Sequence, residues 1–339
     1  MNIKILLTCV GGELMPFLIK YLKKMKNFEI YLVGTDMDDG AIGKYFCDKF
    51  YRTHRGNSSK YLADCKKIVI KEKINLIIPT SDEEALALSK NKEIFSKLGA
   101  TVACVEYKTL RVLNNKFQTY KEFSKKKLPV SHWENIKDFE DLTYKIKYFK
   151  KEYGSFVLKP KEGRGSKDIY IFDKDPEIEM KSKIKYIKNE KQFLKKVENK
   201  KNFHKYIIMK KLMNPVVDLD MLSWNGKAIS IIPRKRIHPT FPNMGHKILY
   251  NSDLIALGKK IIKAFKLSWL YDCDIMFDEN NNPSIIEINP RQSGSISVSV
   301  AAGYRIFDNL LRLYLGKKIL KEQSLKETLV IPFKDLSNF

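Results

Sequence analysis

Only five cysteines occur in the 339-residue sequence, and each stands alone: Cys9, Cys47, Cys65, Cys104 and Cys273. None has the Cys-x-x-Cys spacing of a zinc or redox site, which argues against a disulfide framework. The sequence also lacks a run of 18 apolar residues, so it predicts no membrane-spanning helix. No small-residue cleavage site follows the apolar run at residues 3–10, so we expect no signal peptide and a cytoplasmic protein.

Arginine is scarce, although the net charge is +24. Lysine supplies most of the excess, as at Lys125-Lys126-Lys127, and is interleaved with aspartate and glutamate along the chain. Arginine is the residue that usually reads bases, so this composition favours solvated lysine faces over a specific nucleic-acid partner. The positive charge can still attract anionic substrates such as nucleotides.

Two common phosphate-binding motifs are absent as well. Gly11-Gly12 follow a predicted strand, but the pattern Gly-x-Gly-x-x-Gly is missing, and Glu13 would repel a pyrophosphate. The basic loop at residues 161–168 joins two predicted strands and contains no Gly-Lys-Ser/Thr, so it is not a Walker A loop. Its backbone N–H groups could close over phosphates as a nest, with Lys159 adding charge. An ordinary hairpin turn is the alternative.

Strand and helix patterns alternate through the first 105 residues. Strands are predicted at residues 3–10, 29–35, 76–79 and 101–105, and helices at 14–24, 62–73 and 81–98. This alternation predicts a small open parallel sheet with helices on both faces. Thr80-Ser81-Asp82-Glu83 follows one strand end and is a candidate edge for a second substrate; a plain helix N-cap is the alternative.

Near the C-terminal end, two apolar runs flank an Asn- and Pro-rich loop at residues 278–283, which predicts a β-hairpin. Because strand side chains alternate, Glu287, Asn289 and Arg291 share one face. Symmetric closure about Asn280-Asn281 would place Asp274 opposite Glu287. Facing carboxylates repel, so we expect a cation between them, and oxygen ligands suit Mg²⁺. The alternative is a solvated polar face.

Five parts then occur in a recognisable order. They are Asn115-Lys116, the run Lys159-Pro160 with Gly163-Arg164-Gly165-Ser166, Pro233-Arg234-Lys235-Arg236, Asp274, and Glu287-Ile288-Asn289-Pro290-Arg291. Over residues 1–316 the chain resembles the ATP-grasp superfamily, and is similar to the carbamoyl phosphate synthase large subunit and to stand-alone carboxylate–amine ligases.

The resemblance implies an α/β fold of three parts and a tail. An open-parallel-sheet pre-ATP-grasp domain would occupy residues 1–107, and the ATP-grasp module would follow in two subdomains. The lid subdomain with the glycine loop would span 108–205, and the C-terminal subdomain with the metal hairpin would span 206–325. Residues 326–339 would form a tail.

The resemblance also implies roles for individual residues. Lys116 and Lys159 would hold the ATP phosphates, and the loop Gly163, Arg164, Gly165 and Ser166 would cover them. The backbone at Lys210, Lys211 and Leu212 would contact adenine, with Asp218 or Asp220 at the ribose. Asp274, Glu287 and Asn289 would ligate Mg²⁺, while Arg291 and Arg234 would neutralise the transferring phosphoryl group.

Three features depart from the family pattern. The hinge strand ends in Lys210-Lys211, where an acidic residue near the adenine and ribose is usual. Asp168 stands where a glycine is common, which would stiffen the lid. Residues 174–188 have the composition of a charged insertion.

The resemblance implies an ATP-dependent ligase that phosphorylates a carboxylate and couples the acyl phosphate to an amine, releasing ADP and phosphate. The alternatives are phosphorylation of carbamate or amidation of a sugar acid, and a non-catalytic nucleotide-binding protein. The expected cofactors are ATP and Mg²⁺, with Mn²⁺ as a substitute. The expected partners are a small carboxylate and a small amine. A homodimer is compatible with this interpretation. The loops at 241–246 and 292–295 carry no readable code for the substrates.

Overall fold

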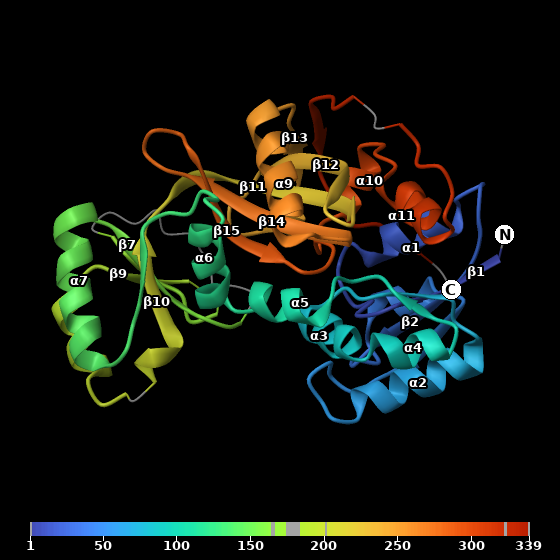
Figure 1. Ribbon diagram of the computed structural model, residues 1–339, viewed down its shortest axis with the longest axis horizontal. Helices are drawn as coiled ribbons and strands as arrows, with labels where there is room; N and C mark the ends of the chain where they lie inside the picture. Colours follow the sequence, from blue (N-terminus) through green and yellow to red (C-terminus); the bar gives the residue numbers. More distant parts are fainter. Residues whose placement is uncertain (1, 164–166, 174–183, 201, 322–323, 338–339) are drawn as a thin grey trace. The chain divides into compact units, whose positions relative to one another are not determined.

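The computed structural model describes residues 2–163, 167–173, 184–200, 202–321 and 324–337. The chain forms two compact units (Figure 1). The first contains Met1–Arg111, Pro215–Ile275 and Ile288–Phe339, and the second contains Val112–Asn214 and Met276–Glu287. Each unit is therefore built from separate segments of the chain.

The first unit begins with a five-stranded sheet in the order β3-β2-β1-β4-β5, in which all pairs are parallel. Its strands are β1 (Asn2–Leu7), β2 (Glu29–Asp36), β3 (Lys49–Arg52), β4 (Leu76–Ile78) and β5 (Thr101–Val102). Ile5 on the central strand pairs with Leu32 on one side and Leu76 on the other, and all three are fully buried. Strands covered on both faces are apolar throughout, which explains why the pattern was readable. The predicted open parallel sheet is confirmed.

Helices connect these strands and carry the site loops. They are α1 (Met15–Lys23), η1 (Ile42–Tyr45), α2 (Tyr61–Glu72), α3 (Asp82–Lys90), α4 (Lys92–Lys97) and α5 (Tyr107–Leu113). The hydroxyl of Ser81 accepts a hydrogen bond from the Glu84 N–H, which caps α3 at the predicted position.

A six-stranded sheet has the order β15-β14-β11-β12-β13-β16. Its strands are β11 (Met213–Trp224), β12 (Lys227–Arg236), β13 (His246–Ile248), β14 (Trp269–Phe277), β15 (Pro283–Asn289) and β16 (Thr328–Val330). Asn225 and Gly226 both have positive φ, as the tight hairpin turn between β11 and β12 requires. β13 and β16 occupy segments that the sequence placed in a loop and in the tail.

Helices pack the first unit into one core. They are α9 (Ser252–Phe265), α10 (Ser297–Ala301) and α11 (Ile306–Tyr314), with η3 (Pro242–Met244) in a loop. A side chain at Gly258 of α9 would lie 3.0 Å from Ile231 of β12, so glycine permits this close approach. One apolar cluster joins Leu18 of α1 to Val298 and Phe307. This shared core holds the N-terminal sheet and the last two helices together.

The second unit contains a five-stranded sheet in the order β6-β10-β7-β8-β9. Its strands are β6 (Trp133–Asn135), β7 (Phe156–Pro160), β8 (Tyr170–Phe172), β9 (Lys185–Ile187) and β10 (Tyr206–Lys210). Its helices are α6 (Lys116–Lys125), α7 (Phe139–Tyr153) and α8 (Glu190–Val197), with η2 (Phe203–Lys205). α7 packs against β7 and β10 (Figure 1). The Phe156 and Phe172 rings stack at 4.5 Å in the aromatic core of this unit.

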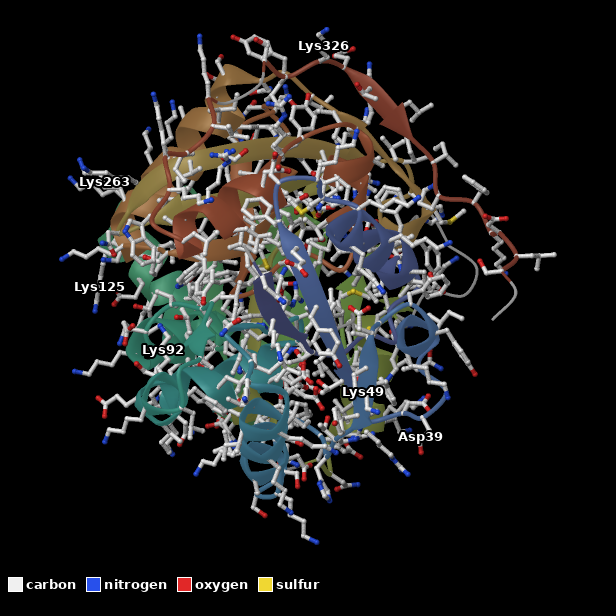
Figure 2. All side chains as sticks on the ribbon, turned by 90° about the vertical axis from the view of Figure 1, so that its right-hand side faces the viewer. Asp39, Lys49, Lys92, Lys125, Lys263 and Lys326 are labelled. Carbon is white, nitrogen blue, oxygen red and sulfur yellow. The ribbon has the colours of Figure 1, made fainter. Side chains whose placement is uncertain are left out.

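Lysine side chains project from the surface of both units. Lys125, Lys263 and Lys326 are exposed and extend away from the ribbon (Figure 2). This agrees with solvated lysine faces as the origin of the net charge.

Candidate active site

In the second unit, Lys159 on β7 is held in a buried position. It is 4% exposed, its Nζ donates to the Tyr120 hydroxyl at 2.5 Å, and it lies 5.0 Å above the centre of the Tyr120 ring. Tyr120 is fully buried on α6 and donates its own O–H to the Ile286 carbonyl at 2.6 Å. The hydroxyl is thus an acceptor for one group and a donor to another, which fixes the ammonium group of Lys159.

Lys116 lies in the first turn of α6, where it joins two predicted site segments. Its Nζ lies 3.1 Å from Oε2 of Glu287 and donates to the Gly163 carbonyl at 3.0 Å. Its backbone N–H donates to the Lys161 carbonyl at 2.7 Å. Within this unit, the predicted residues Lys116, Gly163 and Glu287 are therefore brought together from distant parts of the sequence.

The predicted glycine loop is only partly described. Gly163 has φ +115°, a backbone conformation that residues other than glycine rarely adopt. Arg164, Gly165 and Ser166 lie outside the described residues, and their role stays a prediction.

The hinge lysines make ion pairs within the second unit. Nζ of Lys210 lies 2.6 Å from both carboxylate oxygens of Glu279, and Lys211 pairs with Asp173. The backbone N–H groups of Lys210 and Lys211 donate to the carbonyls of His132 and Ser155. These two N–H groups therefore already donate to neighbouring segments. The predicted adenine contact stays a prediction for the backbone of Leu212 and for the carbonyl groups of Lys210 and Lys211.

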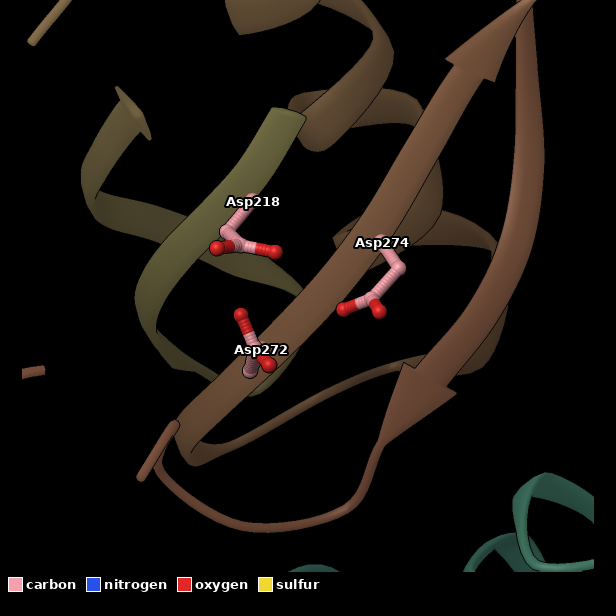
Figure 3. Close-up of side chains that lie close together, drawn as sticks. All are labelled: Asp218, Asp272 and Asp274. Carbon is pink, nitrogen blue, oxygen red and sulfur yellow. The ribbon is translucent and has the colours of Figure 1, made fainter. Parts of the chain in front are cut away.

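In the first unit, three carboxylates converge from two neighbouring strands (Figure 3). They belong to Asp218 on β11 and to Asp272 and Asp274 on β14, and one oxygen of each lies within 4.8 Å of the others. Nη2 of Arg236 joins two of them, at 2.5 Å from Asp218 and 2.8 Å from Asp274. Nε2 of His246 lies 2.7 Å from the other oxygen of Asp218.

Asp218, Asp220 and Arg234 lie in buried ion pairs, and the roles predicted for them toward the nucleotide stay predictions. Asp218 and Asp220 are 1% and 0% exposed, and their carboxylates are held by arginines and by His246 or Ser299. Arg234 is also fully buried: its Nε lies 2.8 Å from Asp220 and its Nη1 donates to Ser295. Its charge is therefore used inside the protein, and Arg236 is the arginine that reaches Asp274.

The charged groups of this cluster shift one another's pKa values. Burial alone would raise the pKa of Asp218, but Arg236, His246 and Arg234 lower it below its ordinary value. Burial, together with Asp274, Asp218 and Asp220, raises the pKa of Asp272 well above its ordinary value. Burial also lowers the pKa of His246, which favours the neutral imidazole.

Asn289 and Arg291 extend this cluster toward the N-terminal sheet of the same unit. Nδ2 of Asn289 donates to Oδ2 of Asp272 at 3.1 Å, and Nε of Arg291 lies 3.0 Å from Oδ1 of Asp82. Nη2 of Arg291 lies 3.4 Å from Oδ1 of Asn289. Asp82 belongs to the predicted second-substrate edge, so that edge lies beside Arg291.

Of the predicted metal ligands, the first unit thus contains Asp274 and Asn289, while Glu287 belongs to the second unit. The predicted pairing of Asp274 opposite Glu287 stays a prediction. The donor atoms present are carboxylate and amide oxygens, which suit Mg²⁺. Oδ1 of Asp272 is also buried without a hydrogen-bond donor among the described residues, so the cluster fits a bound cation.

Sequence reasoning missed Tyr120, Arg236 and Asp272. The strand alternation placed Asp272 on the same face as Asp274, and Arg236 on the same face as Arg234, so a signal existed for these two. Tyr120 had none, because a tyrosine at helical spacing has the pattern of a core residue.

Two family comparisons cover most of the chain. Residues 202–334 match the family described as ATP-grasp in the biosynthetic pathway with Ter operon, and residues 5–103 match the PylC-like N-terminal domain. The resemblance to the ATP-grasp superfamily that the motifs predicted is therefore confirmed over residues 202–334. No curated protein matches the sequence significantly.

Solved structures of low identity share the fold. N5-carboxyaminoimidazole synthetase from Staphylococcus aureus, complexed with ADP, is 16% identical, with a TM-score of 0.72 over 98% of this chain and 83% of that one. The biotin carboxylase domain of 2-oxoglutarate carboxylase from Hydrogenobacter thermophilus, in complex with MgADP, ADP and bicarbonate, is 18% identical, with a TM-score of 0.69 over 94% and 71%. L-amino acid ligase from Bacillus licheniformis is 14% identical, with a TM-score of 0.62 over 94% and 75%.

Within the ranges that the structure describes, every helix is too short or too polar to cross a bilayer.

Proposed function

We propose that this protein is an ATP-dependent ligase that converts a carboxylate into an acyl phosphate and transfers the acyl group to an amine. The observation that carries the proposal is the meeting of Lys116 and Glu287 at 3.1 Å. It brings a predicted phosphate-binding lysine to a predicted metal carboxylate from distant parts of the sequence. Phosphoryl transfer needs positioning and positive charge more than covalent catalysis, and lysines supply both.

The second unit supplies the groups for the nucleotide. Lys116 and Lys159 would bind phosphate oxygens, and Tyr120 holds Lys159 in place through the 2.5 Å hydrogen bond. Mg²⁺, when bound, would neutralise phosphate charge, with Asp274, Glu287 and Asn289 as its predicted ligands. Mn²⁺ would serve as a substitute.

The first unit supplies the groups for the acyl phosphate and the amine. A carboxylate oxygen of the substrate attacks the γ-phosphorus, the bond to ADP breaks, and Arg291 stabilises the negative charge on the transferred group. The nitrogen of a neutral amine then attacks the acyl carbon, and phosphate leaves. Asp82 lies 3.0 Å from Arg291, which supports the Thr80–Glu83 edge as the part that recognises the amine.

The ligands and activities of the structural neighbours support the nucleotide and the small-molecule substrates of this proposal. One was crystallised with ADP, a second with MgADP and bicarbonate, and a third is an amino acid ligase. The isolated cysteines are consistent with action in a reducing cytoplasm.

The test is a substrate screen with the purified protein. ATP, Mg²⁺ and pools of carboxylates and amines are supplied, and ADP and AMP are measured separately. We expect ADP and phosphate to form only when both substrate classes are present, and Glu287→Gln to abolish turnover while its far-ultraviolet circular dichroism is unchanged. A protein that gains no thermal stability from ATP or ADP would contradict the proposal, and AMP formation would contradict the acyl phosphate.

A further inference from the structure

We infer that Asp272 is a further ligand of the divalent cation, and that the first unit binds this cation through Asp272, Asp274 and Asn289 before any nucleotide arrives. The inference deepens the proposed function by adding a metal ligand beyond those that the motif predicts. The cation would then bind to the protein before ATP binds.

The first observation is the state of the Asp272 side chain. The residue is 4% exposed, and its Oδ2 accepts a hydrogen bond from Asn289 Nδ2 at 3.1 Å. Its Oδ1 is buried and accepts no hydrogen bond from any residue that the structure describes. The nearest ion-pair partner of Oδ1 is Nη2 of Arg234 at 3.9 Å, and that nitrogen already donates to Asp220 at 2.9 Å. A buried carboxylate oxygen left in this way costs free energy unless a cation or a proton occupies its free side.

The second observation is the direction of the neighbouring oxygens. Asp272 and Asp274 stand two residues apart on β14 and therefore share a face, and their carboxylates converge (Figure 3). The Asn289 hydrogen bond to Asp272 uses the amide nitrogen, and its Oδ1, which accepts a long hydrogen bond from Nη2 of Arg291 at 3.4 Å, keeps a second lone pair for a cation. Asp218 is a poor candidate for ligation, because Arg236 and His246 already hold both of its oxygens.

The third observation is the balance of charge. Within the first unit, ion pairs connect four carboxylates, those of Asp218, Asp220, Asp272 and Asp274, to the guanidinium groups of Arg234 and Arg236. With all four carboxylates ionised and His246 neutral, two negative charges exceed the positive charges of this cluster. A divalent cation compensates both, and buried charges persist only when they are paired or bind metals.

A proton on Asp272 is the competing explanation, since it too would satisfy Oδ1. It would remove only one of the two excess charges, and it would leave Asp272 with no role toward the cation. The two explanations differ in what an asparagine does at this position. Asparagine retains an acceptor for the Asn289 amide but loses the negative charge, so a merely orienting residue would tolerate it and a ligand would not.

The experiment measures Mn²⁺ binding to the full chain without nucleotide, from the loss of the free Mn²⁺ electron paramagnetic resonance signal. We expect one Mn²⁺ per chain in the wild type and an affinity at least about tenfold lower in Asp272→Asn. Asp278→Asn is the matched control, because Asp278 is a half-buried carboxylate in the turn that follows the same strand, and it should bind as the wild type does.

Thermal unfolding of the metal-free proteins provides a second readout that needs no activity. Asp272→Asn removes an uncompensated buried charge, so it should melt at the same temperature as the wild type or higher, and Mn²⁺ should raise only the wild-type and control melting temperatures. Wild-type protein that binds no Mn²⁺ until nucleotide is added would overturn the inference, as would equal Mn²⁺ affinity in Asp272→Asn. Neither result would contradict the proposed ligase function. That proposal is contradicted if the protein does not bind nucleotide.

Discussion

Tyr120 illustrates how one hydroxyl can organise a binding site. It is buried on α6, accepts a hydrogen bond from Lys159, donates to the Ile286 carbonyl beside Glu287, and lies 3.8 Å from Sδ of Met209 on the hinge strand. Three segments of the proposed nucleotide site therefore depend on the same atom. The ring fills core space, while the hydroxyl directs the lysine.

Tyr120→Phe should separate these two roles. The ring remains, but Lys159 loses its acceptor, so we expect ADP affinity to fall by about 1 kcal/mol, roughly fivefold, with adenosine affinity unchanged. Isothermal titration calorimetry with both ligands measures this, and Tyr144→Phe on exposed α7 is the control, since Tyr144 is 68% exposed. An equal loss for adenosine would show that the hydroxyl supports the fold rather than the phosphate site.

Lys159→Met tests the phosphate role of the lysine itself. Methionine is apolar and of similar shape, so it can occupy the buried position, but it cannot bind a phosphate oxygen. We expect about a 10- to 100-fold loss of ADP affinity, the range for hydrogen bonds to charged groups. Retained affinity in equilibrium binding would remove Lys159 from the nucleotide site.

The burial of individual side chains in the sheet could not be predicted from the sequence. Arg234 and Arg236 share a face of β12 and belong to one motif, yet Arg234 is fully buried under Ser295 whereas Arg236 reaches Asp274. Strand alternation predicts which face a side chain occupies. It does not predict what covers that face, because the covering segment is distant in sequence.

At the scale of elements, the buried apolar segments were predictable and several short, more polar strands were not. The central strands of the N-terminal sheet are mostly apolar, and Asn225-Gly226 marks the turn between β11 and β12 of the six-stranded sheet. β3, β6, β13 and β16 have only three or four residues each, mostly polar or half-buried, so their sequences carry little strand signal. Their pairing with neighbouring strands is what makes them strands.

The start of α3 is an element whose stability can be tested. The Ser81 hydroxyl accepts from the Glu84 N–H and donates to Oε2 of Glu84 at 2.7 Å, and the Thr8 hydroxyl also donates to this oxygen. Ser81→Ala removes the cap and leaves Glu84 short of a donor in a buried position, so we expect a loss of about 1–2 kcal/mol. Urea unfolding gives the value, and Ser96→Ala, at an exposed position of α4, should change it little. Equal effects at the two serines would contradict the capping role.

At the scale of the whole molecule, the family was predictable because its motifs keep their order along the chain. Lys116, Gly163 and Glu287 meet in one unit, and Asp274, Asn289 and Arg291 lie in the other. The division of the metal hairpin between two compact units was not predictable, because it depends on contacts between distant segments. The identity of the substrates was not predictable either, because it depends on the conformation of the loops that contact them.

Buried cysteines offer a test of the N-terminal sheet and its helices. Burial raises the pKa of Cys65 and that of Cys104 to about 12, so the thiolate fraction at pH 8 is only about 10⁻⁴ and rises about tenfold with each pH unit. We expect both to resist iodoacetamide in the native protein at pH 8 and to react once guanidinium chloride unfolds it, as mass spectrometry of the peptides would reveal. Rapid labelling of either cysteine in the native protein would contradict this part of the fold.

The central claim is that ATP transfers its γ-phosphoryl group to a carboxylate. It is tested most directly by supplying ¹⁸O-labelled carboxylates with ATP, Mg²⁺ and an accepted amine, and by measuring the label in the phosphate released. An acyl phosphate passes one carboxylate oxygen to phosphate, so the account predicts one ¹⁸O per phosphate in the wild type and no labelled phosphate with Glu287→Gln. Product formation with unlabelled phosphate, or with AMP and pyrophosphate, would contradict it.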